Sequence, residues 1–381
     1  MAEITVYDKA IDKGLEGVVA CSTAISTIED TTLNYRGYTI EDLAHHSSFE
    51  ETVFLLWNDR LPNSRELELF SLQLRSNMVL PENFFNLLKM LPVNGVHPMT
   101  WLRTAVSLLA HVDPEAQDNS AVANQNKSLR LTARMSTLVC ALQAIRKNQE
   151  LPTPRKDQSV AWNFLYMLQG GKEPNPEHAK IFDTCLILHA DHELNCSAFA
   201  ARVTASSLSD LYSAVVSAIA ALKGPLHGGA NEQVLLMLQK IGTVEKAKDF
   251  VKNALANKEK VMGIGHRVYK NGDPRAAILK KFSEKLTAEA GLSHLYQMSV
   301  LIDQTMYQEK GLMPNVDFYS ATVYHSMNIP SDLFTPIFAA SRIAGWCAHV
   351  LEQYGNNRIY RPRGKWVGAS GRKWLPVTQR G

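Results

Sequence analysis

The chain has 381 residues, of which 45% are hydrophobic and 20% are charged, and its formal net charge at pH 7 is +3. This composition is typical of a globular protein with two domains or one large core, and the small net charge argues against nucleic acid as the main partner. The five cysteines include no Cys-x-x-Cys pair, so we expect reduced thiols in a cytoplasmic protein, without disulfides or a zinc knuckle. We expect no signal peptide, and no apolar run is long enough to span a membrane.

Helix start signals dominate the chain, so we predict an all-α fold. The one β region that we predict lies within residues 17–35, which are rich in Val, Ile and Thr. Capping patterns follow at Thr39, Ser48 and Asn63, each with an acidic residue three positions later.

Further along the chain, polar segments alternate with helical periodicity. Surface loops are predicted over residues 113–126 and 147–158. The pair Asn175-Pro176 places a cap before a first-turn proline. The helices that we predict beyond it span residues 178–192, 209–222, 231–241 and 333–353.

Two turns divide the chain. Gly224-Pro225 and residues 328–330 are the best hinge candidates. We therefore predict a large domain of residues 1–224 and 329–381, and a small domain of residues 225–328.

The most informative loop runs from Gly263 to Arg275 and places His266 between glycines and Arg275 behind an Asp-Pro turn. Glycine lets a backbone approach a ligand closely. An imidazole ring that titrates near neutral pH can interact with a carbonyl group, and a guanidinium group can bind a carboxylate.

Two further histidine motifs have a similar character. On a continuous helix, His189 and His192 would share a face, as a polar helix end or as a metal pair. His227 precedes a predicted helix, whose N-terminus disfavours imidazolium. A neutral His227 could donate a hydrogen bond to an enolate oxygen, and a turn histidine without chemistry is the alternative.

A carboxylate and a second arginine complete the set. Asp317 comes just before a helical pattern and is either its N-cap or a carboxylate base. Arg342 falls on an apolar column with Phe338 and Trp346. It therefore needs an anionic partner, an internal ion pair, or a route to solvent.

The chain end is strongly basic. No acidic residue follows Glu352. The tail is either a solvated basic segment or the source of a cation for an anion site. Its basic residues are Arg358, Arg361, Arg363, Lys365, Arg372, Lys373 and Arg380.

Together these motifs suit a reaction between a polyanionic acid and a carbon acid. Taken in order, they resemble the citrate synthase family over essentially the whole chain. The matching motifs are Leu33-Asn34-Tyr35-Arg36-Gly37-Tyr38, His97-Pro98-Met99, His192-Glu193-Leu194-Asn195, Gly224-Pro225-Leu226-His227-Gly228, residues 263–275, Asn315-Val316-Asp317, Ser341-Arg342 and Tyr360-Arg361-Pro362-Arg363.

The resemblance implies an acyltransferase that condenses acetyl-CoA with oxaloacetate and water to citrate and coenzyme A, the entry step of the tricarboxylic acid cycle. By the same resemblance, Asp317 removes a methyl proton from the acyl thioester. His227 donates to the thioester oxygen, and His266 polarises the ketone of oxaloacetate.

The resemblance also implies an active site in the cleft between the two domains, and it implies the binding residues. His192, Arg275 and Arg342 would hold the carboxylates of oxaloacetate, and Arg361 would reach in from the partner subunit of a homodimer. No metal and no cofactor beyond the substrates are implied. The residues implied for coenzyme A are Val261, Met262, Gly263, Ile264, Gly265, Lys270 and Asn315.

Three alternatives stay open. The compact branch that the chain resembles also contains 2-methylcitrate synthases, which use propionyl-CoA, and one methylene is worth only about 1–3 kcal/mol of discrimination. A metal-dependent hydrolase or lyase would use His189, His192 and Glu193. The third alternative is a non-catalytic assembly protein, or a higher homo-oligomer that keeps the activity.

Overall fold

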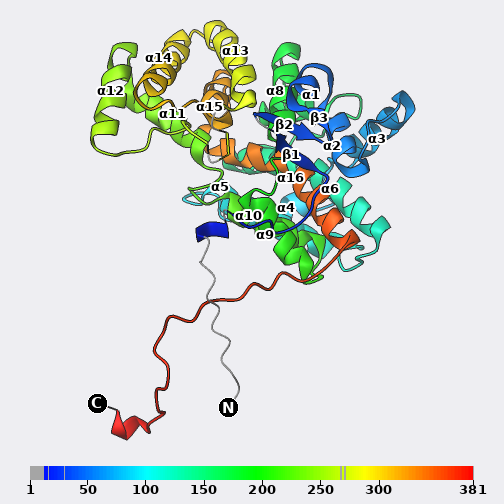
Figure 1. Cartoon of the computed structure of the whole chain (residues 1–381). Coiled ribbons are helices and arrows are strands. Elements are labelled where there is room, and N and C mark those ends of the chain that lie inside the picture. Colours follow the sequence, from blue (N-terminus) through cyan, green and yellow to red (C-terminus); the bar gives the residue numbers. More distant parts are fainter. Residues whose placement is uncertain (1–12, 16, 30, 267, 270–271, 381) are drawn as a thin grey trace.

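The computed structural model describes residues 13–380 except for 16, 30, 267, 270 and 271. This part of the chain is mostly helical, which confirms the predicted all-α class (Figure 1). None of its helices is long and apolar enough to cross a membrane. The elements are η1 (Lys13–Leu15), β1 (Ser26–Glu29), β2 (Thr32–Tyr35), β3 (Tyr38–Thr39), α1 (Ile40–His46), α2 (Phe49–Asn58), α3 (Ser64–Ser76), α4 (Phe84–Lys89), α5 (Pro98–Val112), α6 (Ala121–Arg146), α7 (Val160–Leu168), α8 (Pro176–His189), α9 (Cys196–Ser206), α10 (Leu211–Leu222), α11 (Ala230–Ile241), α12 (Val244–Ala256), α13 (Pro274–Glu289), α14 (Ser293–Lys310), α15 (Val316–Ser326), η2 (Ser331–Leu333), α16 (Phe334–Gly355) and η3 (Val377–Gln379).

The predicted β region is confirmed as a small antiparallel sheet in the order β1-β2-β3. Ser26 on β1 pairs with Tyr35 on β2. Arg36 and Gly37 connect β2 to β3 with φ angles of 48° and 84°. Two successive positive φ values are the geometry of a tight hairpin turn, which explains the glycine.

The predicted helix starts are also confirmed. The Thr39 and Ser48 hydroxyls accept the backbone N–H groups of Asp42 and Glu51. Asn63 and Glu66 form a reciprocal capping box. These contacts satisfy N–H groups that the first helical turn leaves without partners.

Two predicted boundaries are wrong. The loop expected over residues 113–126 ends early because the Ser120 hydroxyl caps α6, which begins at Ala121. The helix expected over residues 178–192 ends at His189. There the Asp191 N–H donates to the Tyr35 hydroxyl at 3.0 Å and so does not extend the helix.

Helix α16 forms the centre of the core. It contacts α2, α5, α6, α8, α9, α10 and α11, and every residue from Phe334 to Val350 is buried. At Gly345 the helix approaches the end of α8, and the Gly345 N–H donates to the Ala190 carbonyl at 3.1 Å. A Cβ atom at position 345 would lie 2.3 Å from an Asp191 carboxylate oxygen, so only glycine fits.

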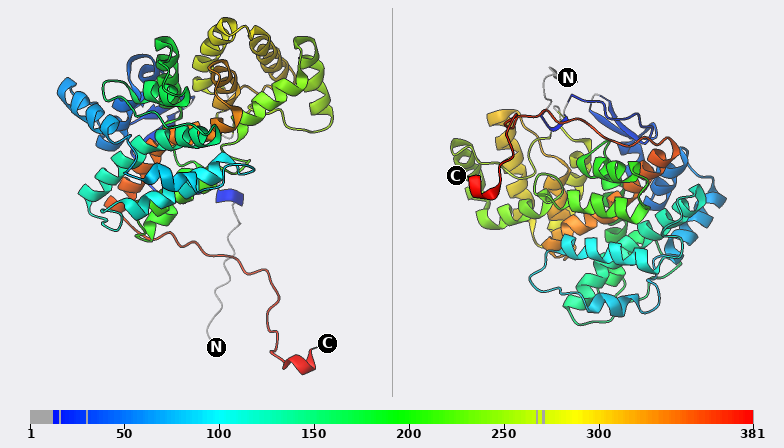
Figure 2. Two further views of the ribbon diagram at one scale, coloured as in Figure 1. Left: turned by 180° about the vertical axis from the view of Figure 1, so that it is seen from behind. Right: turned by 90° about the horizontal axis from the view of Figure 1, so that it is seen from below.

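Helices α11–α15 pack on one another and lie together at one end of the molecule (Figure 1). The division into domains at residues 225 and 328 stays a prediction. After α16 the chain is exposed and leaves the body as an extended tail (Figures 1 and 2).

Candidate active site

The segment between α8 and α9 carries the first site histidine. His192 is buried in a turn, not on the helix, so it does not share a helical face with His189. Burial, then the charges of Arg275 and Arg342, hold the pKa of His192 well below its usual value. A neutral imidazole at neutral pH follows.

His266 lies next to His192, with 5.1 Å between the ring centroids. The Nδ1 atom of His266 accepts the backbone N–H groups of Val268 (3.0 Å) and Tyr269 (3.2 Å). Burial, then Arg275, lowers its pKa to about 4. The single proton of the neutral ring must therefore sit on Nε2, which can donate to a ligand carbonyl.

His227 has the opposite tautomer. Its Nε2 accepts the backbone N–H of Ser197 at 3.2 Å, so Nδ1 carries the proton of the neutral ring. Burial, then the charge of Arg342, lowers its pKa to about 4. The sequence suggested a neutral ring because of the α11 N-terminus, and the structure adds burial and Arg342 as causes.

Asp317 is the candidate carboxylate base. It is not the N-cap of α15, because Asn315 occupies that position and its side-chain oxygen accepts the Asp317 N–H at 3.0 Å. Its Oδ1 is buried and has no hydrogen-bond partner among the described residues. Burial, opposed in part by Arg275, raises the pKa of Asp317 to about 7, which suits a general base at neutral pH.

The two arginines differ in their partners. Arg275 forms two hydrogen bonds to the Asp273 carboxylate, at 2.9 and 2.8 Å, and its pKa is raised. Arg342 donates through Nε to the His189 carbonyl at 2.7 Å. Its Nη1 is buried and has no partner among the described residues, and burial lowers its pKa to about 10.

Of the alternatives left open for Arg342, an internal ion pair is not formed within the described part of the chain. Its guanidinium carbon lies 4.7 Å from the centre of the Phe338 ring, so the helix column supplies an aromatic face and no anion. A buried cation with an unused donor is a binding group for an anionic ligand.

Residues 261–265 form a loop that is hydrogen-bonded to the segment that leads into α15. The Gly265 N–H donates to the Met313 carbonyl at 2.8 Å, and the Asn315 side-chain amide donates to the Gly265 carbonyl at 2.9 Å. Gly263 has φ of 74°, and a Cβ atom there would lie 2.7 Å from Val234. Val261 is buried, and Met262 and Ile264 are partly buried, while Lys270 lies outside the described residues.

One chain does not bring every candidate together. Arg361 is exposed in the tail after α16, whereas His192 and Asp317 are buried. Among the described residues, no group of three or more His, Cys, Asp and Glu side chains could hold a metal ion. His189 instead places Nδ1 2.8 Å from the Cys185 carbonyl.

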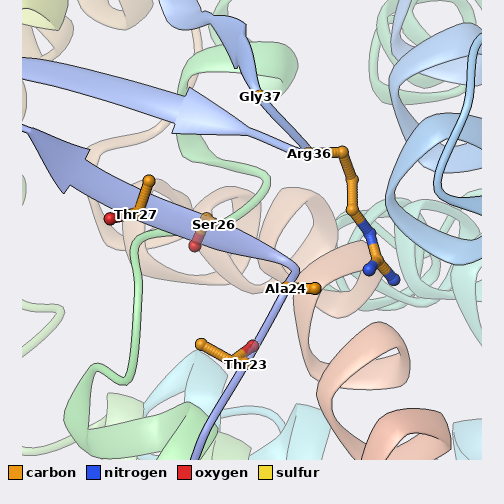
Figure 3. A pocket seen from close by; sticks show the side chains of 6 residues that line it. All are labelled: Thr23, Ala24, Ser26, Thr27, Arg36 and Gly37. Carbon is orange, nitrogen blue, oxygen red and sulfur yellow. The ribbon is translucent and has the colours of Figure 1, made fainter.

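Hollows are also present in the described structure. One of about 70 Å³ adjoins the hairpin at Ser26 and Arg36 (Figure 3). Another of about 420 Å³ lies between α1, α8 and α13 and is lined by Lys180 and Phe282 among others. The site histidines line neither of them.

Comparisons with known proteins decide the family. The family model described as "Citrate synthase, C-terminal domain" matches residues 14–363. The chain belongs to the citrate synthase family. It is accordingly an acyltransferase, and three similar proteins illustrate the relationship.

"Citrate synthase 2" of Bacillus subtilis is 52% identical over 97% of this chain and 99% of its own length. The 2-methylcitrate synthase of Shewanella oneidensis is 41% identical over 98% of this chain and 99% of its own. The citrate synthase of Thermoplasma acidophilum, solved with carboxymethyl coenzyme A and oxaloacetate, matches with a TM-score of 0.91 and 32% identity, over 97% of this chain and 100% of that one.

Sequence reasoning missed three residues that support the site of this citrate synthase family member. Asp273 binds Arg275 and also accepts the Val316 N–H at 3.0 Å, so it joins α13 to the start of α15. The Tyr269 hydroxyl lies 3.2 Å from Nε2 of His192. The backbone N–H of Ser197 donates to Nε2 of His227 and orients its ring. Asp273 and Tyr269 lie within the Gly263–Arg275 motif, which was the available signal.

Proposed function

We propose that this enzyme condenses acetyl-CoA with oxaloacetate and water to give citrate and coenzyme A. The observation that carries the proposal is the buried Asp317, whose Oδ1 has no partner among the described residues and whose pKa of about 7 suits a base. The charges of Arg275 and Arg342 act on Asp317, and they also act on the neutral His266 and His227 respectively. The bound molecules of the Thermoplasma acidophilum structure, oxaloacetate and a coenzyme A derivative, support the same substrates here.

In the proposed reaction, the Asp317 carboxylate takes a proton from the acetyl methyl group. The Nδ1–H of His227 donates a hydrogen bond to the thioester oxygen and stabilises the enolate that forms. The enolate carbon then attacks the ketone carbon of oxaloacetate, while the Nε2–H of His266 donates to the ketone oxygen and stabilises the developing charge. Water cleaves the citryl thioester and releases free coenzyme A.

The binding assignments follow the same proposal. His192, Arg275 and Arg342 hold the carboxylates of oxaloacetate, and the unused Nη1 of Arg342 is the donor best placed to receive one. The loop of residues 261–265 receives coenzyme A, with Asn315 against its pantetheine arm and Lys270 near its phosphates. We propose no metal and no resident cofactor.

The identity of the acyl substrate can be tested by identifying the reaction product. We propose acetyl-CoA as the main substrate, and the 2-methylcitrate synthase relative favours propionyl-CoA as the second candidate. Purified enzyme with oxaloacetate, a chelator and either thioester should release thiol, and mass spectrometry should identify the product. A higher kcat/KM for propionyl-CoA would move the assignment to 2-methylcitrate, and activity lost with the chelator would favour a metal enzyme.

We further propose a cytoplasmic homodimer in which Arg361 enters the partner's site. Its place in the exposed tail supports this assignment. Arg361→Ala and Asp317→Asn should each be nearly inactive alone. A mixture refolded in equal amounts should regain about a quarter of wild-type activity, since half of the dimers then hold one complete site. No recovery would place Arg361 in its own subunit's site.

A further inference from the structure

A cross-strand pair in the small sheet holds the segment that presents His192. Ser26 and Tyr35 face each other across β1 and β2, and both side chains are buried. Figure 3 shows Ser26 on its strand. Although about 160 positions separate the sheet from His192, each of the two hydroxyl groups binds the backbone between α8 and α9.

The Tyr35 hydroxyl replaces the next turn of α8. It accepts the Asp191 N–H at 3.0 Å and lies 2.8 Å from the Asp191 carbonyl and 3.2 Å from the Ile187 carbonyl. In a continued helix, the Asp191 N–H would donate to the Ile187 carbonyl. The tyrosine thus ends the helix and fixes the backbone directly before His192.

Ser26 fixes the backbone directly after His192. Its hydroxyl donates to the Asp191 carboxylate at 2.5 Å and accepts the Glu193 N–H at 2.8 Å. Glu193 has φ of 49°, a conformation that a non-glycine residue adopts only when its surroundings hold it. The hydrogen bond from its N–H to Ser26 supplies such a constraint.

The same segment also orients an arginine. The His189 carbonyl, two residues before Asp191, accepts the Nε–H of Arg342 at 2.7 Å. Displacement of residues 189–193 would therefore move His192 and turn the Arg342 guanidinium together. A shift of about 1 Å in such groups can cost about a hundredfold in rate.

We propose that Ser26 and Tyr35 are positioning residues for oxaloacetate binding, acting through His192 and Arg342. The inference rests on the proposed function, in which those two residues hold the carboxylates. It gives the N-terminal sheet a role in the specificity of the site, although neither hydroxyl group belongs to the substrate-binding set.

The test compares Tyr35→Phe and Ser26→Ala with Tyr354→Phe. The Tyr354 hydroxyl also donates to a backbone carbonyl, that of Ser209, but outside the site, so this variant is a matched control for a lost tyrosine hydrogen bond. For each variant we would measure kcat, the KM of each substrate, the melting temperature, and oxaloacetate affinity by calorimetry.

We expect Tyr35→Phe and Ser26→Ala each to raise the KM and Kd of oxaloacetate about tenfold. A change of this size corresponds to the loss of about one hydrogen bond between the enzyme and oxaloacetate. The KM of acetyl-CoA should stay within about twofold. Tyr354→Phe should lower the melting temperature and leave both KM values unchanged.

A lower melting temperature with unchanged oxaloacetate KM and Kd in both site variants would overturn the proposal and leave the pair with a structural role alone. Failure of the proposed function would look different, because the wild-type enzyme itself would then release no coenzyme A. Calorimetry would still compare oxaloacetate binding among the variants. Should one variant not fold, the other removes a single hydroxyl group from the opposite side of the same segment.

Discussion

Replacing the buried Asp317 by asparagine should stabilise the protein in a pH-dependent way. Burial raises the pKa of Asp317 from 3.8 to about 7. Between these values the folded protein keeps a proton that the unfolded chain has released. The stability that this proton contributes is fully present below pH 3.8 and is lost as the pH rises through 7. Asparagine resembles the protonated carboxyl group, so the variant keeps this stability at every pH.

The size of the effect follows from the width of this window. Each pH unit within it changes the free energy of unfolding by about 1.36 kcal/mol. Between pH 5.5 and 7 the wild type should lose about 2 kcal/mol that the variant keeps. Asp317→Asn should thus be about 2 kcal/mol more stabilising at pH 8 than at pH 5.5.

Urea denaturation of both proteins at pH 5.5 and pH 8, at one fixed protein concentration, measures this difference. Asp249→Asn removes an exposed carboxylate from α12 and serves as the control for a change in net charge. Equal stabilisation by Asp317→Asn at the two pH values would refute the reasoning, because Asp317 would then be ionised throughout the range.

Three further predictions concern turnover and binding. His227→Ala should lower kcat by about 10²–10³, the usual effect of one lost oxyanion donor, and a change below threefold would contradict its role. Arg342→Leu should abolish measurable oxaloacetate binding in calorimetry. The same variant should raise the melting temperature of the ligand-free enzyme, since it removes a buried and incompletely paired charge. A lower melting temperature would show that the charge of Arg342 is satisfied in the folded protein. Because Asp317 must be ionised to act as the base, kcat should fall as the pH drops below about 7, and a flat profile between pH 5.5 and 8 would exclude it.

Local signals in the sequence predicted the helix starts well. Thr39, Ser48 and Asn63 each bind an N–H group within three residues, so the pattern contains all the partners that the cap needs. The same holds for Asn175, whose side chain accepts the N–H groups of Glu177 and His178.

Features that depend on distant residues were missed or predicted wrongly. Helix α8 stops at His189 because a tyrosine from β2 accepts the Asp191 N–H group, and no pattern near His189 reveals this. The site residues were found because their motifs resemble a known family, whereas local capping rules alone also allowed Asp317 to be an N-cap. The low pKa of His227 depends chiefly on burial, which a sequence does not display.

Release of coenzyme A tests the central claim most directly. The wild-type enzyme and Asp317→Asn are each mixed with acetyl-CoA, with and without oxaloacetate, and free thiol is followed over time. We predict rapid, oxaloacetate-dependent release by the wild type, and almost none by Asp317→Asn although that variant still binds oxaloacetate. Near-normal release by Asp317→Asn would contradict the assigned base, and no release by the wild type would contradict the proposed reaction itself.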